Sequence, residues 1–289
     1  MNRIGSGAGI FLAGALLLVA ALPLAIADDD TSESDRIDFV VGNVVFVLLH
    51  EFSHLIIQDF EVPVLGNSED AADTLAAVTL IRADRAHPDR DFRLIHMLLT
   101  AADANRILWQ QGLEKDNPVV YLARHPLSVQ RAARITCLAY GSEPDLLEPL
   151  AEIVGLPEFR AFWCDEEYEN AEIAWLWVRD SFVRESTGTA KDHEIEYGPT
   201  NDPDRQVIRE WLMKNEALER VIAPIKDSML LPGAITLRTR SCDTPDAYWD
   251  GNARELVICY QLIEAFYKLS EDEGMRELAE QIREFHRDN

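Results

Sequence analysis

The sequence predicts a mainly α-helical protein of the α+β class, with a small β-sheet close to its C-terminal end. Apolar residues recur at helical spacing over most of the chain from about 39 to 229. Near the end the pattern changes, because apolar positions alternate over residues 235–239 and turn-forming residues follow. The chain has 289 residues and no evident internal repeat. We therefore expect residues 28–289 to fold as a single domain.

The first 27 residues have the layout of a cleaved secretory signal peptide. Arg3 precedes an apolar run from Ala8 to Leu22, and Ala25-Ile26-Ala27 stands before three consecutive aspartates. Cleavage after Ala27 would make the protein periplasmic or extracellular. The alternative is an uncleaved membrane anchor, because residues 8–27 are about long enough to span a bilayer. Only in that case do we expect contact with a membrane.

The charge balance narrows the classes of partner. Removal of residues 1–27 takes away only Arg3 of the 27 basic residues, so 26 bases face 51 acids and the formal charge becomes −25. Such a balance repels phosphate backbones and anionic lipid, which argues against a nucleic-acid partner. It indicates a solvated acidic surface and says nothing more specific about a substrate.

The helices and strands follow from local patterns. Residues 28–37 are polar and predict a loose N-terminus, whereas 39–57 predict a buried helix, although its Val-rich start is also compatible with a strand. Asn67 or Ser68 is suited to cap the next helix, which runs to about Arg82. Residues 185–204 are expected to form a long exposed loop. Further helices are expected over 90–112, 127–140, 144–154, 156–163, 166–183 and 205–229. A sheet of two or three strands is expected from 235–239 and 255–258, followed by a helix from Cys259 to Leu269.

The expected mature chain contains four cysteines: Cys137, Cys164, Cys242 and Cys259. In an exported protein an even number of cysteines indicates disulfides. The positions fall into two pairs that are close in sequence, 137 with 164 and 242 with 259, although three pairings are possible. Four free thiols would be expected only if the protein is not exported. The absence of Cys-x-x-Cys spacing argues against a zinc site built from these thiols.

The segment "FVLLHEFSHLIIQ", residues 46–58, places two histidines and a glutamate in a largely apolar run. On a helix, His50 and His54 lie one turn apart on the same face, so both can direct a ring nitrogen at one zinc ion. Glu51 lies one residue further round, where it can accept a proton from a zinc-bound water without being a ligand. The alternative is a pair of core histidines in a buried ion pair. That alternative leaves a costly polar cluster, for which a metal would compensate.

The segment "LGNSEDAADTLAAV" offers the missing third ligand. Glu69 and Asp73 are four residues apart and share one helical face. In thermolysin-like peptidases an antiparallel second helix supplies a glutamate ligand, and an acid one turn later holds a ligand histidine by its other ring nitrogen. We therefore expect Glu69 to bind the metal and Asp73 to orient a histidine. Asp70 points to a different face and would be the ligand only if the helix were entered differently.

Four segments carry a family resemblance: "LLHEFSHLII", "EVPVLGNSEDAADTLA", "HPLSVQRAARITCLAYGSEPD" and "AYWDGNARELVICYQLIEAF". Together they resemble a bacterial domain-of-unknown-function family catalogued as a "putative metallopeptidase", over about residues 38–270. The resemblance implies a zincin-like helical domain with a gluzincin-type site. In that site His50, His54 and Glu69 would bind zinc, and Glu51 would be the catalytic base.

The C-terminal segment departs from the family pattern. Members commonly have a glutamate where this chain has Gln261, and an Asn-Ala-Phe-Tyr-like element where it has Asp246-Ala247-Tyr248-Trp249. These departures leave the expected zinc ligands untouched. They place in doubt any catalytic role for this segment.

The expected activity is hydrolysis of peptide bonds in a peptide or protein substrate. Zinc would polarise the scissile carbonyl and activate a water, Glu51 would accept the proton, and no covalent intermediate would form. The strand expected at Glu255–Ile258 would either bind the substrate backbone as an extra strand or serve only as a structural partner of residues 234–240. A further donor should stabilise the oxyanion. The sequence offers four candidates: His125, Tyr248, Tyr260 and Arg131.

Two other classes of protein share some of these sequence features. The alternative function is a non-catalytic periplasmic binding or scaffold protein that keeps zinc for stability. An intramembrane peptidase is excluded by count, because after residue 58 no apolar run approaches about twenty residues. The exported zinc metallopeptidase is the leading expectation.

Overall fold

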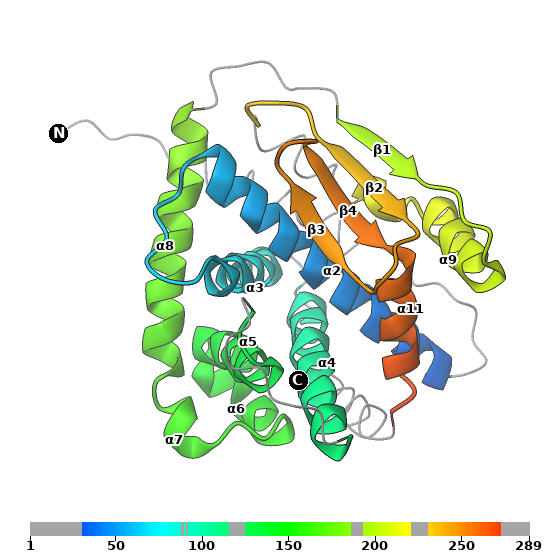
Figure 1. Cartoon of the computed structure of the whole chain (residues 1–289). Helices are drawn as coiled ribbons and strands as arrows, with labels where there is room; N and C mark the ends of the chain where they lie inside the picture. Colours follow the sequence, from blue (N-terminus) through cyan, green and yellow to red (C-terminus); the bar gives the residue numbers. More distant parts are fainter. Residues whose placement is uncertain are drawn as a thin grey trace.

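The computed structural model describes residues 31–87, 90, 92–115, 125–185, 193–220 and 231–272. The expected signal peptide, residues 1–27, lies outside this part of the chain. The described part is mainly helical with a small mixed sheet toward the C-terminal end, as the sequence predicts (Figure 1). The four described strands lie together on one side of α2 (Thr31–Asp59), opposite α3 (Ser68–Ala86) and α4 (Arg93–Glu114) (Figure 1).

The long helix α2, Thr31–Asp59, runs between the helical layer and the sheet (Figure 1). It packs against α3 and α4 on one side and against β3, β4 and α11 on the other. The expectation of a loose N-terminus was wrong for residues 31–37, which are helical. The cause is tertiary, because Arg36 donates to Glu271 at 2.9 Å and to Ser270 at 3.3 Å, more than 230 residues along the chain.

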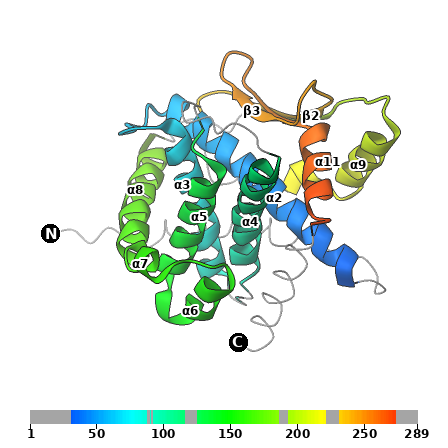
Figure 2. The same ribbon diagram turned by 60° about the horizontal axis from the view of Figure 1, so that its bottom comes forward.

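The helical layer continues from α2 with six elements: α3 (Ser68–Ala86), α4 (Arg93–Glu114), α5 (Ser128–Ser142), α6 (Pro144–Ile153), α7 (Glu158–Ala161) and α8 (Cys164–Glu185). Figure 2 shows α8, α3, α5 and α4 side by side. Buried aliphatic side chains from α2, α3, α4 and α5 form the main core between them. The expected cap of α3 is confirmed, because the Asn67 side chain accepts the backbone N–H of Glu69 at 3.1 Å.

The sheet contains four described strands in the order β1-β2-β4-β3. β1 (Glu194–Tyr197) and β4 (Glu255–Cys259) both pair in parallel with β2 (Thr236–Arg240), while β3 (Ala247–Asp250) pairs antiparallel with β4. One face packs on α2 and α11 (Tyr260–Leu269) through residues that include Leu237 and Leu256. β1 was not predicted, because residues 185–204 were expected to form a loop. This strand depends on pairing with β2, which lies about forty residues further along the chain.

The helix expected over 205–229 is interrupted in the described residues. α9 spans Pro203–Lys214 and is capped by Asp202, whose side chain accepts the backbone N–H groups of two following residues. A turn follows at 215–216, where Glu216 adopts φ of 50°, and residues 217–220 are helical again. Residues 221–229 of the expected helix lie outside the described residues.

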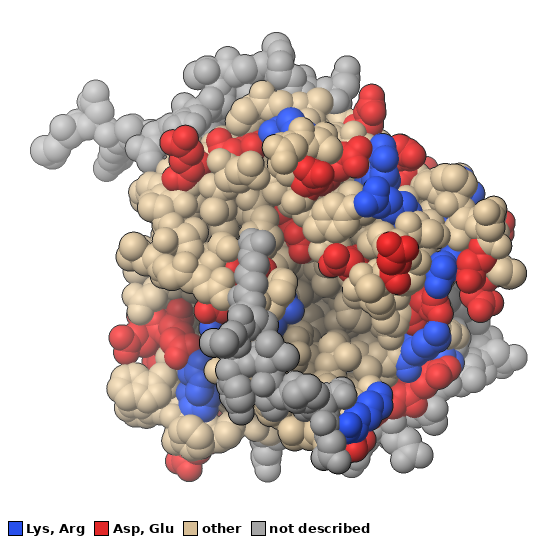
Figure 3. All heavy atoms as spheres, viewed as in Figure 1, with Lys and Arg blue, Asp and Glu red and all other residues tan. Residues whose placement is uncertain are grey.

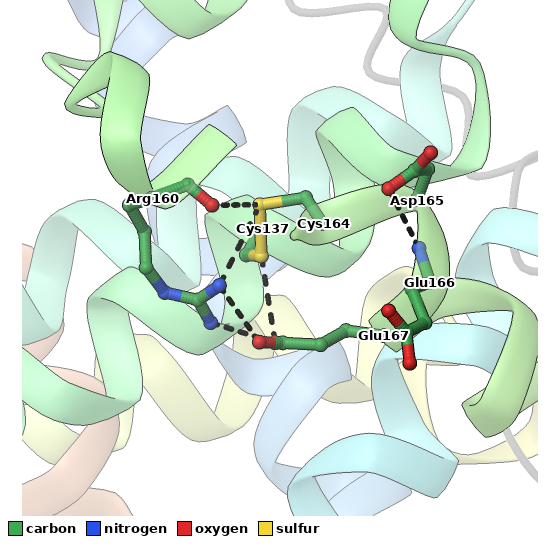
Figure 4. The surroundings of a disulfide bond; sticks show 6 residues. All are labelled: Cys137, Arg160, Cys164, Asp165, Glu166 and Glu167. Carbon is green, nitrogen blue, oxygen red and sulfur yellow. Dashed lines mark hydrogen bonds and ion pairs between the residues drawn. A yellow bond between two sulfur atoms is a disulfide. The ribbon is translucent and has the colours of Figure 1, made fainter. Parts of the chain in front are cut away.

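Both expected disulfides are present. Cys137 on α5 is bonded to Cys164 at the start of α8, and Cys242 is bonded to Cys259 at the end of β4. Figure 4 shows the first disulfide beside the ion pair of Arg160 and Glu167. No described cysteine is free. The bonds tie α5 to α8 and the segment after β2 to the β4–α11 junction.

Removal of the Cys137–Cys164 bond should lower the free energy of unfolding by about 3 kcal/mol, because the bond closes a loop of 27 residues and so restricts the unfolded chain. Urea unfolding of the double variant Cys137→Ala with Cys164→Ala tests this. The Cys242–Cys259 bond closes a loop of 17 residues, so its removal in the matched double variant Cys242→Ala with Cys259→Ala should lower the free energy of unfolding slightly less. An unchanged urea midpoint in either double variant would contradict a stabilising role for that bond.

Candidate metal centre

The site lies where α3 begins beside the middle of α2. A short turn joins the two helices, and within it Gly66 adopts φ of 118°, a backbone conformation that suits glycine. α3 then starts with Ser68 and packs along α2. Its first turn therefore faces the part of α2 that carries His50, Glu51 and His54. In the space-filling view this side of the molecule is hollowed near its centre, with acidic side chains along the upper side of the hollow (Figure 3).

Three potential ligand atoms converge between the helices. His50 Nε2 and His54 Nε2 are 3.2 Å apart, and Glu69 Oε2 lies 3.3 Å and 3.2 Å from them. Atoms that occupy corners of a tetrahedron about 2.0–2.1 Å from a metal ion are separated by roughly 3.3 Å. The three atoms thus have the spacing of three corners of a tetrahedral site. His50 and Glu69 are buried, and His54 is partly buried.

Asp73 contacts the other ring nitrogen of His50, at 2.7 Å from Nδ1 to Oδ1. Arg131 on α5 donates to both Asp73 oxygens, at 2.8 Å and 2.7 Å. Burial alone would raise the pKa of Asp73, but the bonds to His50 and Arg131 outweigh it and hold that pKa well below its usual range. Asp73 is thus ionised and can fix the His50 ring with Nε2 directed at Glu69 and His54.

The same bonds act on His50. Burial lowers the pKa of His50, but the hydrogen bonds to Asp73 and Glu69 outweigh burial and raise it to about 9. A pKa of this size means that the imidazole carries a proton at neutral pH when no metal competes for it. A metal ion must displace this proton to bind at Nε2.

Glu51 lies next to the ligand atoms without joining them. Its Oε1 is 3.9 Å from His50 Nε2, and its Oε2 accepts the backbone N–H of Trp249 on β3 at 3.0 Å. Burial raises the pKa of Glu51 to about 7, although the charge of His50 and the Trp249 hydrogen bond oppose the rise. A carboxylate with this pKa can accept and return a proton near neutral pH.

His125 also reaches the cluster. Its Nδ1 is 3.1 Å from Glu69 Oε2, and its side chain is 57% exposed, so it stands on the solvent side. Burial lowers its pKa. His125 precedes α5, which is held against α3 by the pairs of Arg131 with Asp73 and of Arg134 with Asp70. The pair with Arg134 also explains why the Asp70 side chain does not join His50, His54 and Glu69.

The remaining candidates for an oxyanion donor are engaged elsewhere. The Tyr248 hydroxyl contacts Arg240. Tyr260 is fully buried, and its hydroxyl donates to the Gly198 carbonyl at 2.7 Å and accepts from Thr239 at 2.8 Å. The Arg131 guanidinium is used by Asp73. Of the four candidates, His125 is the one placed at the cluster with its side chain open to solvent.

The late strand has a different position from the one that substrate binding would require. β4 lies between β2 and β3, so of the two alternatives left open for Glu255–Ile258, the structural partner of β2 is confirmed and the exposed substrate-binding strand is wrong. β3 is one of the two edge strands, the other being β1, and it is the strand next to Glu51. No side-chain pattern in the sequence indicates this contact, because a backbone N–H makes it. The alternation around Ile235 and Leu237 pointed only to the existence of the sheet.

In this helical protein, two imidazoles on one helix and a carboxylate on the next form a group that could hold a metal ion, with a second carboxylate beside them. The chain belongs to the family described as "Putative metallopeptidase", which matches residues 17–178 and 197–287. Both site helices and most of the sheet lie within the matched residues. No curated protein and no solved structure matches the chain at a significant level.

Proposed function

We propose that this protein is an exported zinc metallopeptidase of the HExxH type. The proposal rests mainly on one observation, the mutual spacing of 3.2–3.3 Å among His50 Nε2, His54 Nε2 and Glu69 Oε2 with Glu51 beside them. Two imidazoles and one carboxylate are a ligand set that catalytic zinc sites use, with a further position left for water. Membership of a family described as a metallopeptidase supports the same class of reaction.

In this proposal each residue near the cluster has a separate task. Zinc held by His50, His54 and Glu69 would polarise the scissile carbonyl and lower the pKa of the attacking water. Glu51 would take the proton from that water at Oε1 and later deliver it to the leaving amine. His125 stands on the open side and would donate to the oxyanion as the carbonyl carbon becomes tetrahedral.

The edge of the sheet supports a peptide substrate. The Asp246 carbonyl accepts the Cys259 N–H at 3.0 Å, whereas the Trp249 N–H points away from β4 to Glu51. Because successive residues in a strand alternate in the direction of their hydrogen-bonding groups, those of Ala247 also face the outer edge. An extended substrate would add to this edge through backbone hydrogen bonds and lie beside Glu51.

Two observations bear on the compartment. The disulfides of Cys137 with Cys164 and of Cys242 with Cys259 fit an oxidising, exported environment. Among the described residues, one helical stretch, Ser34–Asp59, is long and apolar enough to cross a membrane. Since 67% of its most apolar window is buried inside the protein, this stretch serves as a core helix. Export through cleavage after Ala27 is part of the proposal.

Zinc affinity should depend on pH through His50. The pKa of this imidazole is raised to about 9 before metal binds, and zinc requires the neutral ring. The apparent affinity should therefore rise about tenfold per pH unit from pH 7 and level off above about pH 9. Competition with a chromophoric chelator measures this slope, and calorimetry in buffers of different ionisation enthalpy counts the released proton. A flat profile from pH 7 to 9 would contradict the assignment of His50.

The proposed function is tested by zinc analysis of the purified mature chain together with digestion of a mixed peptide library. The expected result is about one zinc per chain and cleavage by the wild type. A protein that holds zinc but cleaves no peptide would instead favour the non-catalytic scaffold. A protein without zinc affinity would contradict both.

A further inference from the structure

The sheet is fastened to α2 immediately behind Glu51. The Trp249 backbone N–H donates to Glu51 Oε2 at 3.0 Å, and its indole Nε1–H donates to Gln58 Oε1 at 2.8 Å. At the end of α2, Arg254 donates to both oxygens of Asp59, at 3.0 Å and 2.8 Å. The sheet therefore contacts α2 at three residues, namely Glu51, Gln58 and Asp59.

The spacing of residues along α2 explains how this helix carries both the proposed metal ligands and the proposed base. Residues seven apart on a helix lie on the same side, so Glu51 and Gln58 both face β3. His50 and His54 lie on the adjoining side and face α3. α2 therefore presents the ligands to one neighbour and the base, with its attachment points, to the other.

The two oxygens of Glu51 are distinguished by this arrangement. Oε2 is occupied by the Trp249 N–H, and Oε1 is the oxygen that lies 3.9 Å from His50 Nε2. The terminal torsion of a glutamate is broad, so a carboxylate without such a bond can rotate through many orientations. The bond from β3 selects the orientation in which Oε1 faces the ligand cluster.

The turn after β3 packs against the Gln58 amide that accepts the Trp249 indole N–H. A Cβ added at Gly251 would lie 2.4 Å from Gln58 Oε1 and 2.5 Å from its Nε2. The Gln58 amide therefore fills the space next to the Gly251 backbone. A side chain at this position would push the amide away from the Trp249 indole.

We propose that Gln58, Trp249 and the Arg254–Asp59 pair form a clamp that positions Glu51 for proton transfer. This inference rests on the proposed function. The clamp residues are positioning residues, because they act through Glu51 and β3. Their role is to keep the edge strand and the base in a fixed relation while substrate binds.

Replacing Trp249 with phenylalanine, or Gln58 with leucine, should lower kcat roughly 10- to 100-fold with little change in KM or zinc content, because small misplacements of a catalytic group carry costs of this size. Gln58→Glu keeps an acceptor for the indole and should restore most of kcat. Gly251→Ala should resemble Gln58→Leu. If KM rises in these variants while kcat stays unchanged, the clamp serves only substrate binding and the proposal is overturned.

Trp175→Phe is the matched control. Its indole N–H donates to Thr79 Oγ1 at the same distance of 2.8 Å, but within the helical core. This variant loses a comparable hydrogen bond and should keep the wild-type kcat per folded molecule. Equal losses of kcat in Trp175→Phe and Trp249→Phe would mean that general destabilisation causes the effect, and the proposal would fail.

Hydrogen exchange tests the clamp without activity. The Trp249 amide lies on a sheet edge and should nevertheless be protected in the metal-free wild type, because Glu51 accepts it. Exchange at this amide should accelerate by roughly tenfold or more in Glu51→Ala and in Gln58→Leu, and remain unchanged in Trp175→Phe. Unaltered exchange in Gln58→Leu would overturn the clamp. If the wild type cleaves no peptide, the proposed function fails while this measurement still decides the clamp.

Discussion

Glu51→Gln should remove peptide hydrolysis and keep the metal. The loss in kcat is expected to be roughly 10²–10⁴-fold, the usual contribution of a positioned general base. Zinc content should be unchanged, because the Glu51 carboxylate lies beside the three converging ligand atoms and Oε2 is engaged by β3. A glutamine can still accept the Trp249 N–H, so the contact between α2 and β3 should survive.

The same substitution should raise the stability of the metal-free protein at alkaline pH. The pKa of Glu51 is raised to about 7 by burial, so the folded state binds its proton more tightly than the unfolded state does. The carboxyl group therefore contributes stability below its unfolded pKa near 4.5, and that contribution is lost as the pH rises through about 7. A neutral amide avoids this loss, and a higher Tm at pH 8 is expected.

The outcomes of this experiment distinguish the possible roles of Glu51. Loss of zinc together with activity in Glu51→Gln would mean that Glu51 is a ligand. Wild-type hydrolysis in the variant would remove Glu51 as the base. Steady-state kinetics, elemental analysis and thermal unfolding of the same preparations provide all the readouts.

Glu69→Gln should weaken zinc binding by roughly 10²–10³-fold and remove activity with it. This size follows from dividing the apparent 10–16 kcal/mol of a four-ligand structural zinc site among its ligands. An amide oxygen is a neutral and weaker ligand than a carboxylate. The Glu69 side chain is buried, and its Oε2 lies at the point where His50 and His54 converge, so the substitution acts directly on the proposed ligand set.

Asp70→Asn provides the matched control for this prediction. Asp70 is the next residue on the same helix turn, but it pairs with Arg134 on α5. The variant should retain zinc and lose only the contribution of a partly exposed ion pair, about 0–1 kcal/mol of stability. Zinc loss in Asp70→Asn with retention in Glu69→Gln would show that the wrong carboxylate has been assigned.

The sequence was most informative where the signal is local. The spacing of His50 and His54 and of Glu69 and Asp73 fixes which side chains share a helix face, and the structure places all four in contact. Asn67 is a capping residue by type and caps α3. These features depend on neighbours within about one helical turn, and helical geometry alone relates them.

The features that could not be predicted from the sequence depend on contacts between residues that are far apart along the chain. The first turns of α2 are polar and are held in place by Ser270 and Glu271. β1 is a short strand with an alternating pattern of partial exposure and exists through its pairing with β2. The Trp249 contact with Glu51 is made by a backbone N–H, which every residue except proline carries. No side-chain pattern could have indicated it.

X-ray absorption at the zinc edge of the purified mature protein shows whether His50, His54 and Glu69 converge on one zinc ion. We expect nitrogen and oxygen neighbours at about 2.0–2.1 Å, with imidazole scattering from two rings and no sulfur. Sulfur ligation at about 2.3 Å, or scattering without imidazole, would contradict this convergence.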